Sequence, residues 1–123
     1  MKKPRILYVD DEPLNLLLLK ANLSKQYEVL TAPDGIAGLE VLKNNRDIKV
    51  VFSDMKMPHM SGIEFIRQAT ALAPENHYYI VTGFDINAEI QKALDEGLIR
   101  KYFSKPFNPD EIANEIRHSL QIS

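Results

Sequence analysis

The chain has 123 residues, of which 45% are hydrophobic and 26% charged, and its formal net charge is −2. This composition predicts one globular domain over residues 1–123, and the absence of cysteine excludes disulfides and thiolate metal sites. The sequence has no basic stripe for direct nucleic-acid binding and no apolar run of about 20 residues to span a membrane. The composition is compatible with a cytoplasmic location.

The first third of the chain alternates short apolar runs with longer amphipathic ones. Residues 6–9 are apolar on both faces, which predicts a buried strand. Pro13 suits the first turn of a helix that residues 14–23 continue, and we expect the leucine-rich run 14–19 to lie in the core. Residues 29–31 predict a second strand, after which Asp34 can cap a second helix.

The middle of the chain repeats this alternation. Residues 50–53 predict a third strand that is apolar throughout. Ser61 and Glu64 form a capping-box pattern, which predicts the start of the next helix. Residues 79–82 predict a fourth strand, but its polar beginning at residues 77–79 suggests an exposed edge or a partner surface.

The last third completes the pattern. Asp85 or Asn87 can open a fourth helix that stops near Gly97, residues 102–103 predict a short fifth strand, and Asn108 can cap the last helix. Five strands that alternate with five helices imply an α/β fold, a doubly wound parallel sheet with helices on both faces.

Polar residues gather at the predicted strand ends, where ligands bind in an open α/β sheet. The first strand is followed by Asp10 and Asp11, the third ends at Asp54, the fourth ends at Thr82, and Lys105 follows the fifth. If the first and third strands are neighbours, three carboxylates converge, and a hard divalent cation such as magnesium would offset their repulsion. This set suits phosphoryl transfer, in which a carboxylate can be the nucleophile.

Four motifs together resemble those of response regulator receiver domains. They are residues 9–13 (VDDEP), 54–62 (DMKMPHMSG), 82–83 (TG) and 105–107 (KPF). The resemblance extends over essentially the whole chain. It implies a flavodoxin-like sheet with strand order 2-1-3-4-5 and five helices on its two faces. It also implies a cis peptide bond before Pro106.

The resemblance implies a phosphoacceptor role for Asp54. Its carboxylate would accept a phosphoryl group from a histidine kinase or a phosphotransfer protein, in a magnesium-dependent reaction. Asp11, Asp54 and the backbone carbonyl of Lys56 would bind Mg²⁺, and Asp10 would act through a metal-bound water. Such a domain catalyses its own phosphorylation and dephosphorylation and is otherwise not an enzyme.

The resemblance also implies how a signal leaves the site. Lys105 would pair with one phosphoryl oxygen, Thr82 would donate its hydroxyl to another, and Tyr102 would be the aromatic switch residue. A partner or output domain on a longer parent chain would read this switch. Residues 96–102 depart from the usual receiver pattern and look more like receivers attached to signalling enzymes, including cyclic-dinucleotide phosphodiesterases.

Two other functions fit part of the sequence. An aspartate-nucleophile phosphatase of the haloacid-dehalogenase type needs a second acid two residues after its nucleophile, and Asp10 with Glu12 imitates this poorly because Pro13 follows directly. A pseudo-receiver, which acts without phosphorylation, would not need the acids, Thr82 and Lys105. Incubation with acetyl phosphate and magnesium distinguishes these alternatives from a phosphorylated receiver.

Overall fold

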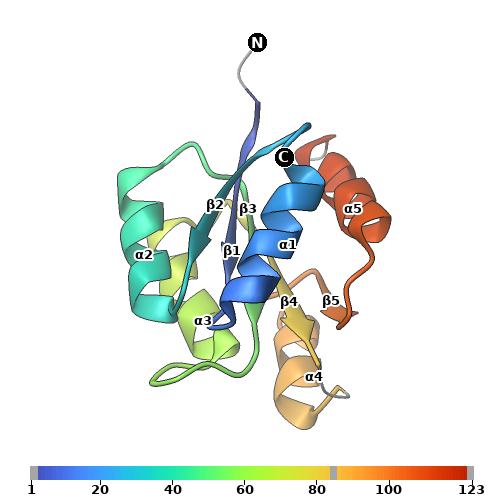
Figure 1. Cartoon of the computed structure of the whole chain (residues 1–123). Coiled ribbons are helices and arrows are strands. Elements are labelled where there is room, and N and C mark those ends of the chain that lie inside the picture. Colours follow the sequence, from blue (N-terminus) through green and yellow to red (C-terminus); the bar gives the residue numbers. More distant parts are fainter. Residues whose placement is uncertain (1–2, 84–85, 122–123) are drawn as a thin grey trace.

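Five short apolar segments form one parallel sheet in the computed structural model, which describes residues 3–83 and 86–121 (Figure 1). The strands are β1 (Arg5–Val9), β2 (Glu28–Ala32), β3 (Val50–Asp54), β4 (His77–Thr82) and β5 (Lys101–Ser104). The helices are α1 (Pro13–Leu23), α2 (Gly35–Asn44), α3 (Gly62–Leu72), α4 (Ala88–Asp95) and α5 (Pro109–Gln121). The strand order β2-β1-β3-β4-β5 confirms the predicted order and the flavodoxin-like α/β fold.

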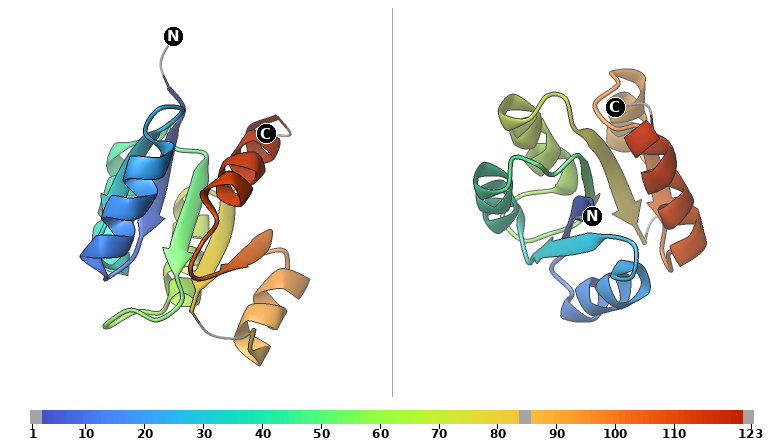
Figure 2. Two further views of the ribbon diagram at one scale, coloured as in Figure 1. Left: turned by 45° about the vertical axis from the view of Figure 1, so that its right-hand side comes forward. Right: turned by 90° about the horizontal axis from the view of Figure 1, so that it is seen from above.

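Helices cover both faces of the sheet, which Figure 2 shows from two further directions. Ile6 and Tyr8 of β1 pack in a cluster with residues of α1 and α5. Leu7 and Val9 face the other way and pack with residues of α2, α3 and α4. Because both faces are covered, residues 6–9 of β1 and 50–53 of β3 are buried on both sides, as the sequence predicted.

The order and register of the strands position the acidic residues. Strand β1 lies between β2 and β3, and Val9 pairs with Ser53 of β3. Asp10 and Asp54 each come directly after this pair of residues, so their side chains lie at the same edge of the sheet. This edge, formed by the carboxyl ends of the strands, is the lower one in Figure 1.

The helix starts follow the predicted capping residues. Asp34 accepts a hydrogen bond from the Ala37 N–H, and Ser61 forms a capping box with Glu64. Asn87 and Asn108 also accept hydrogen bonds from backbone N–H groups of the helices that they precede. Helix α4 ends before Gly97, whose φ of 74° lies in the left-handed region that favours glycine. Asp85, the other candidate to open α4, lies outside the described residues.

Two expectations about burial are wrong. Leu14, Leu17 and Leu18 are 58%, 64% and 44% exposed, because α1 turns only one face toward the sheet and leucine occupies several of its other positions. The beginning of β4 is not an edge, since β4 lies between β3 and β5 and both Tyr78 and Tyr79 are buried.

Polar partners make the burial of these two tyrosines tolerable. The Tyr78 hydroxyl donates to backbone carbonyls of α3 and of the residue that follows it, and the Tyr79 hydroxyl donates to Glu115 Oε2 at 2.7 Å. Within residues 3–83 and 86–121, no helix is long and apolar enough to cross a membrane.

Candidate functional site

Three carboxylates meet at the carboxyl edge of the sheet. Asp10, Asp11 and Asp54 each offer an oxygen, and these atoms all lie within 4.8 Å of one another. Asp10 and Asp54 are buried, whereas Asp11 is exposed. Three hard oxygen donors at this spacing fit a small divalent cation such as Mg²⁺.

The side chain of Lys105 reaches two of these carboxylates. Its Nζ atom lies 3.0 Å from Asp10 Oδ2 and 3.2 Å from Asp54 Oδ2. The Lys105 N–H also donates to the Thr82 carbonyl at 2.7 Å, which joins the end of β5 to the end of β4. The peptide bond between Lys105 and Pro106 is cis, as the family resemblance implied.

The charges at this edge do not balance. Burial and the charge of Asp10 raise the pKa of Asp54, although Lys105 and a backbone hydrogen bond from Met55 oppose the shift. Burial by itself would lower the pKa of Lys105, but its hydrogen bond to Asp10 and the charges of both carboxylates raise it. A lysine that stays protonated therefore offsets part of the acidic charge, and a bound cation would offset more.

Asp10 is held by a set of hydrogen-bond donors. Its Oδ2 accepts from the Tyr8 hydroxyl at 2.6 Å and from Asn15 Nδ2 at 3.2 Å, in addition to Lys105. Its Oδ1 accepts from the Glu12 N–H at 2.9 Å. The carboxylate has no solvent exposure, so these donors replace the water that it loses on folding.

The loop after Asp54 passes close to this residue because of Gly62. A Cβ atom at Gly62 would lie 2.2 Å from the Asp54 carbonyl oxygen, a distance that a real side chain cannot occupy. The Gly62 N–H donates to the Met55 carbonyl at 2.8 Å and closes the loop against the strand end. A glycine is therefore required here, as the sequence motif suggested.

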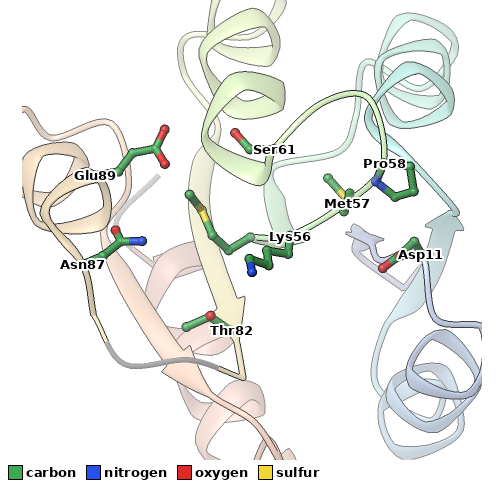
Figure 3. Close-up of a pocket in the computed structure, with 9 residues that line it drawn as sticks. Asp11, Lys56, Met57, Pro58, Ser61, Thr82, Asn87 and Glu89 are labelled. Atoms are coloured by element: carbon green, nitrogen blue, oxygen red, sulfur yellow. The ribbon is translucent and has the colours of Figure 1, made fainter.

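A pocket of about 630 Å³ opens beside the acids (Figure 3). Nine residues line it: Asp11, Met55, Lys56, Met57, Pro58, Ser61, Thr82, Asn87 and Glu89. Figure 3 shows Asp11 on one side and Asn87 with Glu89 on the other, with Lys56 between them. The pocket thus connects the acidic cluster to the start of α4.

Thr82 and Tyr102, the two predicted switch residues, lie on neighbouring strands. Thr82 is the last residue of β4, is 1% exposed and lines the pocket. Tyr102 is on the neighbouring strand β5, where its pairing partner is Ile80, and its half-buried ring packs against the core cluster beneath α4. The two residues therefore lie on adjacent strands, and Thr82 borders the pocket that connects the acids to the start of α4.

The family comparison agrees with this geometry. The family model described as the response regulator receiver domain matches residues 6–117. The chain belongs to the response regulator receiver domain family. Receiver domains are signalling domains of two-component systems rather than conventional enzymes.

Individual relatives give the same assignment. The chain is 30% identical over 123 residues to the chemotaxis protein CheY homolog of Campylobacter jejuni, across 94% of this chain and 92% of that protein. It is 29% identical over 117 residues to the hydrogenase transcriptional regulatory protein HoxA of Bradyrhizobium diazoefficiens. That alignment covers 95% of this chain but 24% of HoxA, so the receiver spans about a quarter of this relative's length.

A solved receiver structure has the same fold. The signal receiver domain of an HD domain-containing protein from Pseudomonas fluorescens Pf-5 superposes with a TM-score of 0.88 at 30% identity. The match covers 98% of this chain and 96% of that one.

Sequence reasoning missed two residues of this site, Tyr8 and Asn15. Tyr8 lies in the apolar run 6–9 and Asn15 in the leucine-rich run that follows Pro13, and neither run by itself indicates a site residue. The two-residue spacing of Tyr8 and Asp10 was the available signal, since alternate side chains of an extended segment lie on the same side.

Proposed function

We propose that the chain is a phosphorylation-activated receiver in which Asp54 accepts a phosphoryl group in a magnesium-dependent reaction. The observation that carries the proposal is the meeting of three carboxylates with Lys105 at one edge of the sheet. The phosphodonor would be the phosphohistidine of a histidine kinase or a phosphotransfer protein. We also propose that residues 1–123 form a single receiver domain whose only catalysis is its own phosphorylation and dephosphorylation.

The proposed metal site uses the oxygen donors already described. Asp11, Asp54 and the backbone carbonyl of Lys56 would bind Mg²⁺ directly, and Asp10 would act through a bound water. When bound, the ion supplies positive charge that offsets the carboxylates and the transferred phosphoryl group. The pKa of Asp54 is raised first by burial and then by the charge of Asp10, and Lys105 offsets this rise only in part, so a bound cation would favour the ionised carboxylate further.

In the transfer, an Asp54 carboxylate oxygen attacks the phosphorus atom. The new P–O bond forms as the P–N bond to the donor imidazole breaks, and the imidazole leaves with the electron pair. Lys105 would move from its present carboxylate partners to a phosphoryl oxygen. The short distance from its Nζ to Asp54 Oδ2 means that this change requires little movement.

Thr82 and Tyr102 are the proposed switch. The Thr82 hydroxyl would turn toward a second phosphoryl oxygen and leave space beside α4. Tyr102, now half-buried, could then move further inward and change the face formed by α4, β5 and α5. The position of both residues on adjacent strands supports this coupling. Phosphorylation would shift the population from the first arrangement of Thr82 and Tyr102 to the second.

The output would lie on a partner or on a longer parent chain. HoxA is a transcriptional regulatory protein about four times as long as the matched segment, and the Pseudomonas fluorescens receiver belongs to an HD domain-containing protein. These relatives support an attached output domain for this receiver. From the net charge of −2 we propose that the receiver itself binds neither nucleic acid nor membrane. A cytoplasmic location stays a prediction.

Acetyl phosphate labelling tests the proposal. The wild-type chain should gain one acid-labile phosphoryl group in the presence of magnesium and none in excess EDTA, as measured by intact-protein mass spectrometry. Asp54→Asn should gain none, because an amide keeps the size of the side chain but is not a nucleophile. Asp47→Asn is a matched control, since its carboxylate is exposed and pairs with Arg5 far from the site.

The same experiment separates the alternatives. A pseudo-receiver would show no label under any condition. A phosphatase would release phosphate continuously without retaining a stoichiometric label. Either result would contradict the proposed function.

A further inference from the structure

Tyr8 carries one of the hydroxyl groups in a mainly apolar cluster. It is fully buried in β1 and packs with side chains of α1, α5 and the neighbouring strands. Its hydroxyl donates to Asp10 Oδ2 at 2.6 Å, the shortest of the hydrogen bonds described for that carboxylate. Burial, followed by the hydrogen bond to Asp10, raises the pKa of Tyr8, so the hydroxyl remains a donor.

The two oxygens of Asp10 are used unequally. Oδ2 accepts from Tyr8, Asn15 and Lys105, whereas Oδ1 accepts from the backbone N–H of Glu12. A carboxylate offers about four acceptor positions, two on each oxygen. Oδ2 is therefore saturated, and Oδ1 keeps acceptor capacity for a cation or for a water bound to one.

The three donors to Oδ2 differ in how firmly they are held. Lys105 is shared with Asp54 and, under the proposed function, moves to the phosphoryl group. Asn15 is half-buried and bonds at the longer distance of 3.2 Å. Tyr8 is locked by packing on a central strand, so its hydroxyl stays in place when Lys105 moves.

We propose that Tyr8 is a positioning residue for magnesium binding: its hydroxyl fixes Asp10 so that Oδ1 can accept a hydrogen bond from a water bound to the cation. The inference rests on the proposed function, since it assigns a role in the same metal site. Residues that orient a metal ligand through a hydrogen bond commonly contribute a factor of about 10–100 to metal affinity. A tyrosine hydroxyl with a purely structural role would contribute to stability alone.

Tyr79 is the matched control for such a structural role. It is fully buried in the same cluster, and its hydroxyl also donates to a carboxylate, Glu115 Oε2, at 2.7 Å. That carboxylate lies on α5 and pairs with Lys101, outside the acidic cluster. Tyr79→Phe thus removes a partly buried tyrosine–carboxylate hydrogen bond of similar length without touching Asp10.

The test is a magnesium titration of the wild-type, Tyr8→Phe and Tyr79→Phe chains, followed by amide chemical shifts. We expect Tyr8→Phe to weaken the Kd for Mg²⁺ about tenfold and Tyr79→Phe to leave it unchanged. In acetyl phosphate labelling, Tyr8→Phe should raise the half-saturating magnesium concentration by a similar factor. The labelling rate of Tyr8→Phe at saturating magnesium should differ from that of the wild type by a smaller factor than the half-saturating magnesium concentration does.

A measurement on the wild type keeps the test independent of how the variants fold. With tyrosine labelled with ¹³C at Cζ, the Tyr8 resonance should shift when magnesium is added, and the Tyr79 resonance should not. An unchanged Tyr8 resonance, or an equal Kd in Tyr8→Phe and the wild type, would overturn this inference alone. A wild-type chain that binds no magnesium would overturn the proposed function as well.

Discussion

The Nζ atom of Lys105 lies 3.2 Å from Oδ2 of Asp54, although the two residues come from the ends of strands that are not adjacent in the sheet. The Lys105 Nζ atom also lies 3.0 Å from Asp10 Oδ2, so the single positive charge of this lysine is shared between two buried carboxylates. This uneven charge balance is the physical basis of the first two predictions below.

Magnesium should stabilise the folded chain. The cation binds the folded site and not the unfolded chain, so a concentration one hundred times the Kd should add about 2.7 kcal/mol. Thermal unfolding with and without magnesium measures the effect. Asp11→Ala should reduce the rise in Tm by weakening the site, while a wild-type Tm that millimolar magnesium leaves unchanged would refute the claim.

Asp54→Asn should stabilise the metal-free chain at neutral pH. The folded-state pKa of Asp54 is raised, so its ionised form disfavours folding, and this cost is fully present above the folded pKa. Removing the charge should therefore increase the free energy of unfolding and raise the Tm. Urea unfolding in EDTA tests this, and an equal or lower free energy of unfolding for Asp54→Asn would contradict it.

Thr82→Ala should separate phosphorylation from its effect on the distant face. The variant keeps Asp54 and Lys105, so it should still accept a phosphoryl group. Without the hydroxyl, the residues around α4 and Tyr102 should respond weakly to beryllofluoride with magnesium, a mimic of the phosphoryl group. Amide chemical shifts measure this response, and a shift pattern in Thr82→Ala equal to that of the wild type would exclude Thr82 as the coupling residue.

His77 should make the free energy of unfolding decrease as the pH is lowered into the mildly acidic range. Burial and the charge of Arg100 lower the pKa of His77, although Glu115 opposes the shift. As the pH falls below the ordinary value of about 6.5, the unfolded chain binds a proton before the folded chain does, and stability is lost down to the folded pKa. His77 Nδ1 also forms a hydrogen bond with the buried Ser119 hydroxyl of α5. When Nδ1 carries a proton, the Ser119 oxygen must be the acceptor of this hydrogen bond.

The check for His77 is the free energy of urea unfolding at pH 7.5 and pH 5.5. His77→Gln should lose less stability between these two pH values than the wild type. His59→Gln is the control, because His59 is exposed on the loop after Asp54 and should leave the difference unchanged. Equal losses in all three chains would show that His77 does not contribute.

Much of the fold could be predicted because local signals and topology agree. Apolar runs gave the strands, Asp34, Ser61 and Asn108 gave helix starts, and the strand ends gave the acids and Lys105. These signals are short-range or follow from the rule that parallel strands end at one edge. The structure brings Asp10, Asp11 and Asp54 together as that rule requires.

The remaining features depend on contacts between distant parts of the chain. The burial of Tyr79 relies on Glu115 of α5, which no local pattern near β4 reveals. The exposure of Leu14 and Leu17 follows from the orientation of α1 against the sheet, which hydrophobicity alone does not give. Tyr8 was hidden because a tyrosine in an apolar strand is ordinary until the position of its hydroxyl is known.

The central claim is that Asp54 carries the phosphoryl group, and chemical trapping tests it most directly. After labelling with acetyl phosphate and magnesium, borohydride reduces an aspartyl phosphate to homoserine, which peptide mass spectrometry can locate. We predict homoserine at position 54, and its absence when magnesium is removed by EDTA. Homoserine at another aspartate, or an unmodified residue 54 in a chain that retains the label, would contradict the account.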